Sequence, residues 1–210
     1  GAFNVALGYN SLQSNTTGNN NVSLGCAALC YNTTGSGNIA VGNSSLKTNT
    51  TGYNNVSIGL NSLICNTTGY SNVAIGAYSL FNNTTSRYNT ALGQGSLFSN
   101  TTGCNNVAVG KGSMATNTTG FGNVAVGYKA LISNVSGGYN VGLGVFTETG
   151  GFTASVIIGA CAQATAGGQF VLGSSAFPIG SVTSESGFSN THTMIIRLNG
   201  ANFKIPLKSV

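Results

Sequence analysis

The sequence of 210 residues carries very little charge, and acidic residues are almost absent from it. Only 4% of its residues are charged, far below the proportion typical of globular proteins. There is no aspartate, and the only carboxylate side chains are those of Glu148 and Glu185. The lack of aspartate excludes a Ser-His-Asp triad within the chain, and also calcium-binding solenoid repeats, which need an aspartate in every turn. Two glutamates so far apart do not predict the carboxylate pair of a glycan-cleaving enzyme.

Long apolar runs and clustered cations are missing as well. No run approaches the roughly 18 apolar residues that a membrane-spanning helix needs. The formal net charge of +5 comes from scattered Lys and Arg residues, whereas nucleic-acid binding needs them clustered on one face. The single histidine, His192, has no aspartate near it, and we interpret it as a surface or hairpin residue rather than a metal ligand or base. We therefore predict no enzymatic activity, no cofactor or metal, no nucleic-acid partner and no membrane insertion.

The five cysteines occupy different positions of different repeats, so they cannot form a stacked series of disulfides. They are Cys26, Cys30, Cys65, Cys104 and Cys161. Cys26 and Cys30 are close in sequence but lack the two further ligands of a zinc site. We interpret the set as small buried apolar residues of a protein that assembles in a reducing compartment.

What the sequence has in abundance is repetition. The consensus N-V-A-[LIV]-G-x-x-S-L-x-x-N-T-T-G-x-x recurs with a period of 17 residues. Its first asparagine falls at Asn4, Asn21, Asn38, Asn55, Asn72, Asn89, Asn106, Asn123 and Asn140. A fixed period of this size is typical of a solenoid. Because the sequence starts inside a repeat, we expect it to be part of a longer protein.

The local chemistry of each repeat indicates the type of solenoid. Val5-Ala6-Leu7 alternates in size with a period of two, which predicts a strand that ends at Gly8. Leu12 predicts a second short inward-facing strand, and the Asn-Thr-Thr-Gly segment has the composition of a turn. Two glycines in each repeat and no apolar stripe of helical period exclude helical repeats. The prediction is an all-β parallel solenoid, or β-roll, whose 17-residue coils stack at about 4.8 Å.

Stacking would place the asparagine of each Asn-Thr-Thr-Gly turn directly above the next. We expect a hydrogen-bonded amide ladder there, as in stacked cross-β structures. Its members would be Asn15, Asn32, Asn49, Asn66, Asn83, Asn100, Asn117 and Asn134. The same asparagines belong to N-glycosylation sequons, so partial glycosylation is the alternative interpretation. Full occupancy is excluded because glycans about 4.8 Å apart would clash.

A single chain is expected to bury too little for its own stability. Each coil offers about three inward apolar residues, such as Val5, Leu7 and Leu12, and their burial does not offset the entropy of ordering a whole coil. We therefore predict a parallel homotrimer. Ile64, Phe81 and Phe98, at the tenth position of consecutive repeats, are candidates for the surface between chains, and simple exposure is the alternative.

Beyond Asn140 the period shortens to 15 and then to 14, with Ser155 and Gln169 taking the place of the asparagine. The long units, with N-x-A-[LV]-G, S-L and S-N-T-T-G, resemble repeats of bacteriophage and other viral tail-fibre proteins. The short units, with V-I-I-G-A-x-A-x-A-x-A-G, resemble the heads of trimeric autotransporter adhesins, which are trimeric left-handed parallel β-rolls. This resemblance covers residues 1–175, and it implies the same fold and a trimeric fibre.

The C-terminal segment has a different pattern. We expect a repeat region at residues 1–175, a linker at 176–191 and a β-hairpin at 192–210. Asn199-Gly200 is a strong hairpin signal. A two-residue turn there would pair Ile196 with Phe203 and Met194 with Ile205. We expect this hairpin to cap the open edge of the last coil.

These observations favour a structural and adhesive fibre, a viral tail-fibre segment on the virion that contacts a receptor, with a glycan as one candidate, on the host cell surface. Candidate ligand contacts are Tyr53, Tyr70, Arg87 and Phe121, which share the sixteenth position of their repeats. Stacked aromatic rings near a cation can bind sugars, or can simply cover the neighbouring backbone. The alternatives are a bacterial surface adhesin and an ice-binding solenoid. Ice binding is less favoured because we expect one threonine of each Thr-Thr pair to point inward.

Overall fold

The structure is a computed structural model that describes residues 1–174, 193–198 and 201–206. It divides into two compact units, Gly1–Ile179 and Gly180–Val210, which are treated separately below. The described residues of the first unit form strands, turns and bends without any helix. Each repeat makes one coil of a parallel β-solenoid, with its asparagine or the residue that replaces it as position 1. Coil 1 therefore begins at Asn4, coil 9 at Asn140, coil 10 at Ser155 and coil 11 at Gln169.

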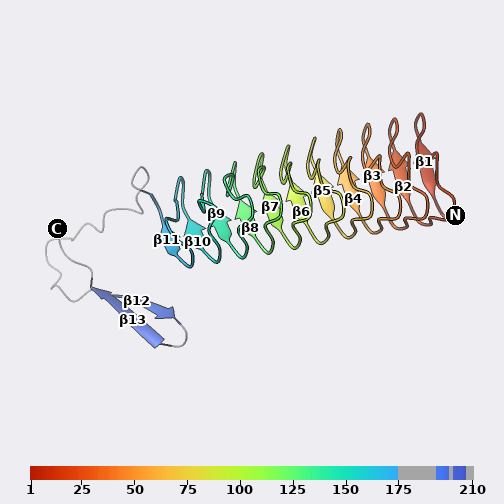
Figure 1. Cartoon of the computed structure of the whole chain (residues 1–210). Coiled ribbons are helices and arrows are strands. Elements are labelled where there is room, and N and C mark those ends of the chain that lie inside the picture. Colours follow the sequence, from red (N-terminus) through yellow and green to blue (C-terminus); the bar gives the residue numbers. More distant parts are fainter. Residues whose placement is uncertain (175–192, 199–200, 207–210) are drawn as a thin grey trace. The chain divides into compact units, whose positions relative to one another are not determined.

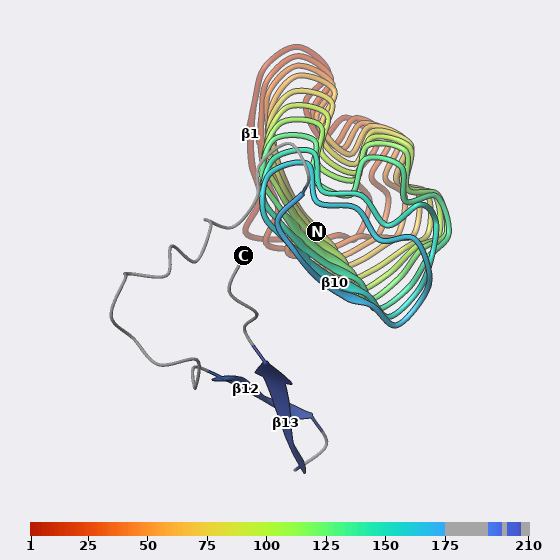
Figure 2. The same ribbon diagram turned by 90° about the vertical axis from the view of Figure 1, so that its left-hand side faces the viewer.

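Eleven short strands form one parallel sheet in strict chain order (Figure 1). Equivalent residues pair throughout, so that Val5 lies opposite Val22, and Ala74 lies opposite Ala91. The strands are β1 (Val5–Leu7), β2 (Val22–Leu24), β3 (Ile39–Val41), β4 (Val56–Ile58), β5 (Val73–Ile75), β6 (Thr90–Leu92), β7 (Val107–Val109), β8 (Val124–Val126), β9 (Val141–Leu143), β10 (Val156–Ile158) and β11 (Phe170–Leu172). Viewed along the row, the coils share one outline, and the strands lie together on one side of it (Figure 2).

Each coil has a single strand, so the prediction of two strands per coil is wrong. The segment around Leu12 and its equivalents is a turn, in which the residue at position 9 has a left-handed backbone, with φ of 52° at Leu46 and at Leu63. A left-handed conformation costs a residue with a side chain about 1–2 kcal/mol. Complete burial of these leucines offsets that cost, because burying a leucine contributes about 1.5–3 kcal/mol.

Gly at position 5 ends every strand for a steric reason. Gly8 has a φ of 132°, and a Cβ atom there would lie 2.5 Å from the carbonyl oxygen of Gly25 on the next coil. Only glycine allows the backbones of neighbouring coils to approach this closely after the strand.

The strands alternate as predicted, but in the opposite phase. Their central residue points inward and is small, as at Ala40 and Ala74, which are fully buried. The flanking residues face outward, so the predicted inward positions of Val5 and Leu7 are wrong. The interior of the coil is narrow, and the leucine at position 9 fills it. Only a small side chain fits opposite that leucine. Leu12 packs against this core, as predicted.

The coils shorten where the sequence predicts. Val156 pairs with Val141, 15 residues earlier, and Phe170 pairs with Val156, 14 residues earlier. Position 1 is thereby held by Ser155 and then by Gln169, and the sheet continues without a break across both changes of period.

The described residues of the second unit form an antiparallel pair, β12 (Thr193–Leu198) and β13 (Ala201–Pro206). Ile196 pairs with Phe203 and Met194 with Ile205, which confirms the register predicted from the Asn199-Gly200 turn. Glu185 and His192, which the sequence analysis considered as chemical groups, lie outside the described residues.

Candidate functional site

The asparagines at position 12 form a continuous buried column. Asn49 donates from Nδ2 to Asn32 Oδ1 at 2.7 Å, and Asn66 donates to Asn49 Oδ1 at 2.8 Å. In every long coil except that of Asn83, the amide also donates to a backbone carbonyl of its own turn, as Asn66 does to Gly69 at 3.0 Å. The last acceptor of the column, Asn134 Oδ1, receives the hydroxyl of Thr149 at 3.2 Å. From coil 2 to coil 8 these asparagines have no exposed surface. Their amide nitrogens are therefore inaccessible for glycosylation in the folded chain.

A second column, which the sequence analysis missed, is formed by the asparagines at position 1. Asn21 Oδ1 accepts the backbone N–H of Asn38 at 2.9 Å, and Asn38 Oδ1 does the same for Asn55 at 3.0 Å. The Nδ2 group of Asn38 donates across its own coil to the carbonyl of Gly52 at 2.9 Å. The unvarying spacing of these asparagines was the signal for this column, since it is as regular as that of the position-12 set.

Ser86 interrupts the pattern in coil 5. Position 15 is glycine in most long coils, and a Cβ atom on Gly52 would lie 2.3 Å from Asn49 Oδ1. Ser86 places its hydroxyl there and donates to Asn83 Oδ1. The same hydroxyl accepts hydrogen bonds from Asn89 at 2.9 Å and from Asn100 at 3.2 Å. Arg87 and Tyr88 follow directly and project to the surface.

Three of the four predicted ligand contacts gather at this corner of coils 3 to 5. Tyr53 and Tyr70 stack with ring centroids 4.7 Å apart and planes 6° from parallel, and Arg87 lies 5.8 Å from the centroid of Tyr70. Tyr88 meets Tyr70 edge-on at 5.4 Å. A hydrogen bond to Tyr70 raises the pKa of the Tyr88 hydroxyl. Tyr53 and Arg87 belong to the coils on either side of Tyr70 and contact its ring, while the Tyr53 side chain remains 44% exposed.

Phe121, the fourth predicted contact, is not part of that cluster. It lies two coils beyond Arg87 and contacts Tyr139 edge-on at 5.0 Å. The tenth-position residues Phe81 and Phe98 also stack on each other, at 5.0 Å and 7°. Aromatic residues at one position of neighbouring coils thus stack on each other, as Tyr53 does on Tyr70 and Phe81 on Phe98.

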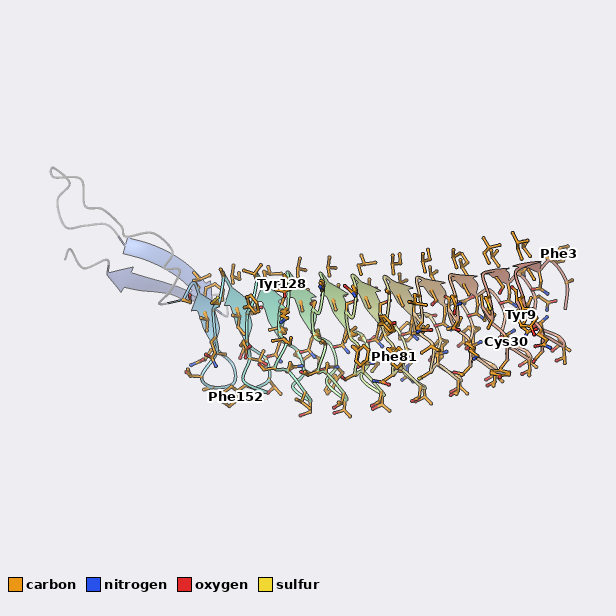
Figure 3. All side chains as sticks on the ribbon, turned by 90° about the horizontal axis from the view of Figure 1, so that it is seen from above. Phe3, Tyr9, Cys30, Phe81, Tyr128 and Phe152 are labelled. Carbon is orange, nitrogen blue, oxygen red and sulfur yellow. The ribbon has the colours of Figure 1, made fainter. Side chains whose placement is uncertain are left out.

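A different cation–aromatic cluster occurs on coils 7 to 9, where the sequence analysis proposed none. The ammonium of Lys129 lies 5.5 Å from the ring centroid of Tyr128 and 5.7 Å from that of Phe146. The two rings meet edge-on at 5.2 Å. Lys111 occupies, on the preceding coil, the position of Tyr128. Figure 3 shows Tyr128 beside the row of strands.

The outer face of the sheet is a long apolar surface of the solenoid. Positions 2 and 4 of almost every coil are Val, Ile or Leu, and their side chains form a row that projects from the strands (Figure 3). In the middle of the stack, Ile58 and Ile75 remain 37% and 38% exposed. Among the described residues of the first unit, the buried core lies on the opposite side of the strands and leaves this face exposed.

The threonine pairs also differ from the prediction that one member points inward. The first threonine of each pair is half-buried or exposed and donates to the backbone of the next coil, as Thr33 does to the carbonyl of Thr50 at 3.0 Å. The second threonine is exposed in every long coil that has one. The aligned hydroxyls named in the ice-binding hypothesis are therefore engaged by the protein itself.

Groups for catalysis or metal binding are scarce in the described part of the chain. Its one carboxylate side chain belongs to Glu148, whose backbone bridges to that of Gln163. All five cysteines are free, but only Cys30 is buried, so the prediction of buried cysteines is wrong for the other four. Burial raises the pKa of the Cys65 thiol. Among the described residues, no three His, Cys, Asp or Glu side chains gather to hold a metal ion. The same residues include no helix with the length and apolarity needed to cross a membrane.

Comparisons with known proteins add no relative to these observations: no family model, no curated protein and no solved structure matches the chain.

Proposed function

We propose that this chain is a structural and adhesive fibre segment, assembled from parallel identical chains that associate through the outer face of β1–β11. The observation that carries the proposal is the nearly continuous apolar row at positions 2 and 4, which only Thr90 interrupts. Eleven strands at about 4.8 Å make this row about 50 Å long. Monomeric soluble proteins rarely leave a continuous apolar surface of that extent uncovered.

The period of the row favours a second copy of the same chain as its partner. A partner must present apolar side chains with the same spacing along the whole length, and a copy aligned in parallel does so at every coil. Three copies around a common axis would allow each face to contact both neighbours in a closed arrangement. The narrow core of a single chain, with one leucine or methionine and small residues in each long coil, makes association favourable.

Attachment to a host cell surface is the role that best fits such a fibre, and the resemblance to tail-fibre repeats supports a place on a virion. The buried residues repeat from coil to coil, whereas the residues at several outward positions differ between coils without disturbing the stack. The cation–aromatic cluster of coils 7 to 9 occupies such positions. We propose that this surface contacts the receptor, and that the chain has no catalytic role.

Sedimentation analysis of matched variants tests the assembly. We expect the parent chain to be a trimer, and Ile58→Lys/Ile75→Lys to dissociate because two charges would enter the apolar interface of each chain. Leu60→Lys/Val145→Lys is the control, since these residues are 43% and 42% exposed but lie outside the sheet. A folded monomeric parent would refute the association. Equal dissociation of both variants would refute the assignment of the interface to the sheet face.

A further inference from the structure

Lys111 and Lys129 are neighbours across two coils of the solenoid. The backbone N–H of Lys129 donates to the carbonyl of Lys111 at 3.0 Å, which fixes the two residues side by side. The other cations with described side chains, Lys47 and Arg87, occupy different coil positions on coils 3 and 5. Within the described side chains, therefore, the positive charge is concentrated only at this pair.

The position of the Lys129 side chain is set by its surroundings. Gly112 occupies the equivalent position on coil 7, and a Cβ atom there would lie 3.3 Å from Lys129 Cγ, so the glycine leaves room for the lysine stem. At the other end, the ammonium is attracted to the rings of Tyr128 and Phe146. The charge is thus held beside two aromatic residues that are each 40% exposed.

The chain does not neutralise this pair. No described carboxylate forms an ion pair with either lysine, and Glu148 is the one carboxylate side chain in that part of the molecule. The ammonium of Lys129 beside two exposed rings, with the exposed Lys111 on the preceding coil, therefore forms a surface that is complementary to an anion attached to an apolar ring edge.

We infer that Lys111, Lys129, Tyr128 and Phe146 form a binding site for an acidic saccharide, with sulfate or carboxylate groups on the lysines and sugar C–H groups against the rings. This inference rests on the proposed attachment role and specifies its ligand class. A nucleic acid is less well matched, because two cations neutralise only two phosphates and nucleic-acid binding depends on many such contacts. Each copy of the chain would add one such site to a fibre, and simultaneous engagement would strengthen weak individual contacts.

The test is binding of the full-length chain to immobilised dextran sulfate and polygalacturonate, with uncharged dextran as the blank. Lys111→Gln/Lys129→Gln should weaken binding by about tenfold or more, because both ion contacts are lost. Lys47→Gln/Arg87→Gln removes the same charge and also two cation–ring contacts, at Tyr31 and Tyr70, and should change binding by less than about twofold. Tyr128→Ala/Phe146→Ala should weaken binding while leaving the charge unchanged. Binding of either acidic polymer by the parent supports the site.

Three results would overturn the site. One is a parent chain that binds neither acidic polymer, and another is an equal loss in the two charge-removing variants, which would indicate diffuse attraction. The third is displacement of both polymers by a single-stranded oligonucleotide at lower concentration, which would indicate a nucleic-acid surface. Sedimentation of the same samples separates this inference from the fibre proposal. A trimer without polymer binding refutes the site alone, whereas a monomer that binds the polymers refutes the assembly alone.

Discussion

The long coils and the short coils fill the same narrow interior in opposite ways. In coil 5, the inward residue of the strand is Ala74, and Leu80 supplies the large side chain from the left-handed turn. In coil 10, the strand supplies the large residue, Ile157, and the residues across from it are Ala162 and Ala164. All five are essentially without exposed surface. A coil of either kind therefore buries one large apolar side chain, but not at a particular position.

Coil 9, where the period changes, shows the conflict between the two arrangements. Its inward strand residue is Gly142, and a Cβ atom there would lie 2.5 Å from Leu131 Cδ2 of the preceding coil. Leu131 is the last leucine at position 9, and its side chain extends into the interior of coil 9. The inward strand residue of coil 9 therefore has to be glycine, whereas coil 10 has a large inward residue, Ile157.

The largest effect on the free energy of unfolding is expected when the large and the small core residue of coil 5 are exchanged. Leu80→Ala removes the large residue and should lower the free energy of unfolding by about 2–5 kcal/mol in each chain. Ala74→Ile overfills the coil and should cost about 1–3 kcal/mol. The double variant should lose less than the sum, because it reproduces the composition of a short coil. Chemical denaturation of all four proteins measures this coupling, and strictly additive losses would contradict the exchange.

The long coils also depend on the position-12 column, which the short coils lack. Asn66→Ala removes the hydrogen bonds with Asn49, Gly69 and Asn83 and leaves buried groups unpaired. We expect a loss of about 2–4 kcal/mol in each chain, since each unsatisfied buried group costs about 1–3 kcal/mol. Cys65→Ser, at a partly exposed neighbour, is the control and should have a much smaller effect. Melting of Asn66→Ala together with the parent would show that the column does not stabilise the stack.

The end of the column should be less sensitive than its middle. Thr149→Val keeps the shape of the side chain but removes two hydrogen bonds, the one that the hydroxyl donates to Asn134 Oδ1 and the one that it accepts from the Gly151 N–H. The expected loss is about 1–2 kcal/mol, the net contribution of two hydrogen bonds, because Asn134 Oδ1 still accepts from Asn140 Nδ2 at 3.5 Å. Thermal unfolding alongside Thr147→Val gives a matched control, because the Thr147 hydroxyl is buried without a hydrogen-bond partner and its loss should be neutral or stabilising. A larger effect at Thr147 than at Thr149 would contradict the assigned role of Thr149.

The smallest effect is expected at Glu148, in the short-coil region. Its side chain makes no hydrogen bond, while its backbone amide and carbonyl pair with Ala162 and Ala164 at 2.9 Å each. Glu148→Gln should therefore change the free energy of unfolding by less than about 0.5 kcal/mol. Combined with Glu185→Gln, it should leave binding to a host surface intact. Loss of a measurable glycan-degrading activity in the double variant would reveal an enzyme.

The sequence was sufficient for those features that follow from the period alone. Residues 17 apart must stack if the chain coils, so the sheet order, the strand register and the position-12 column could all be predicted. The phase of the strand could not be, because Val-Ala-Leu alternates equally well with either face inward. The side of the strand that faces inward is decided by the volume left inside the coil. That volume is set by the leucine at position 9, whose left-handed backbone is not favoured by its local propensity.

Prediction of the surface sites had a similar limit. Tyr53, Tyr70 and Arg87 could be expected to be neighbours, because they share one coil position. Lys129 and Tyr128 hold different positions, and their contacts depend on side-chain direction and on the space above Gly112. The stacking of Lys111 over Tyr128, 17 residues apart, was the available signal.

The amides of the position-12 column all point the same way, each donating toward the coil before it. A long coil therefore presents an acceptor on one side and a donor on the other, and one long coil can follow another. Duplication or deletion of one repeat in the gene would lengthen or shorten the rod by about 4.8 Å without a compensating change elsewhere. The length of such a solenoid can therefore change in evolution by one coil at a time, independently of the residues on its surface.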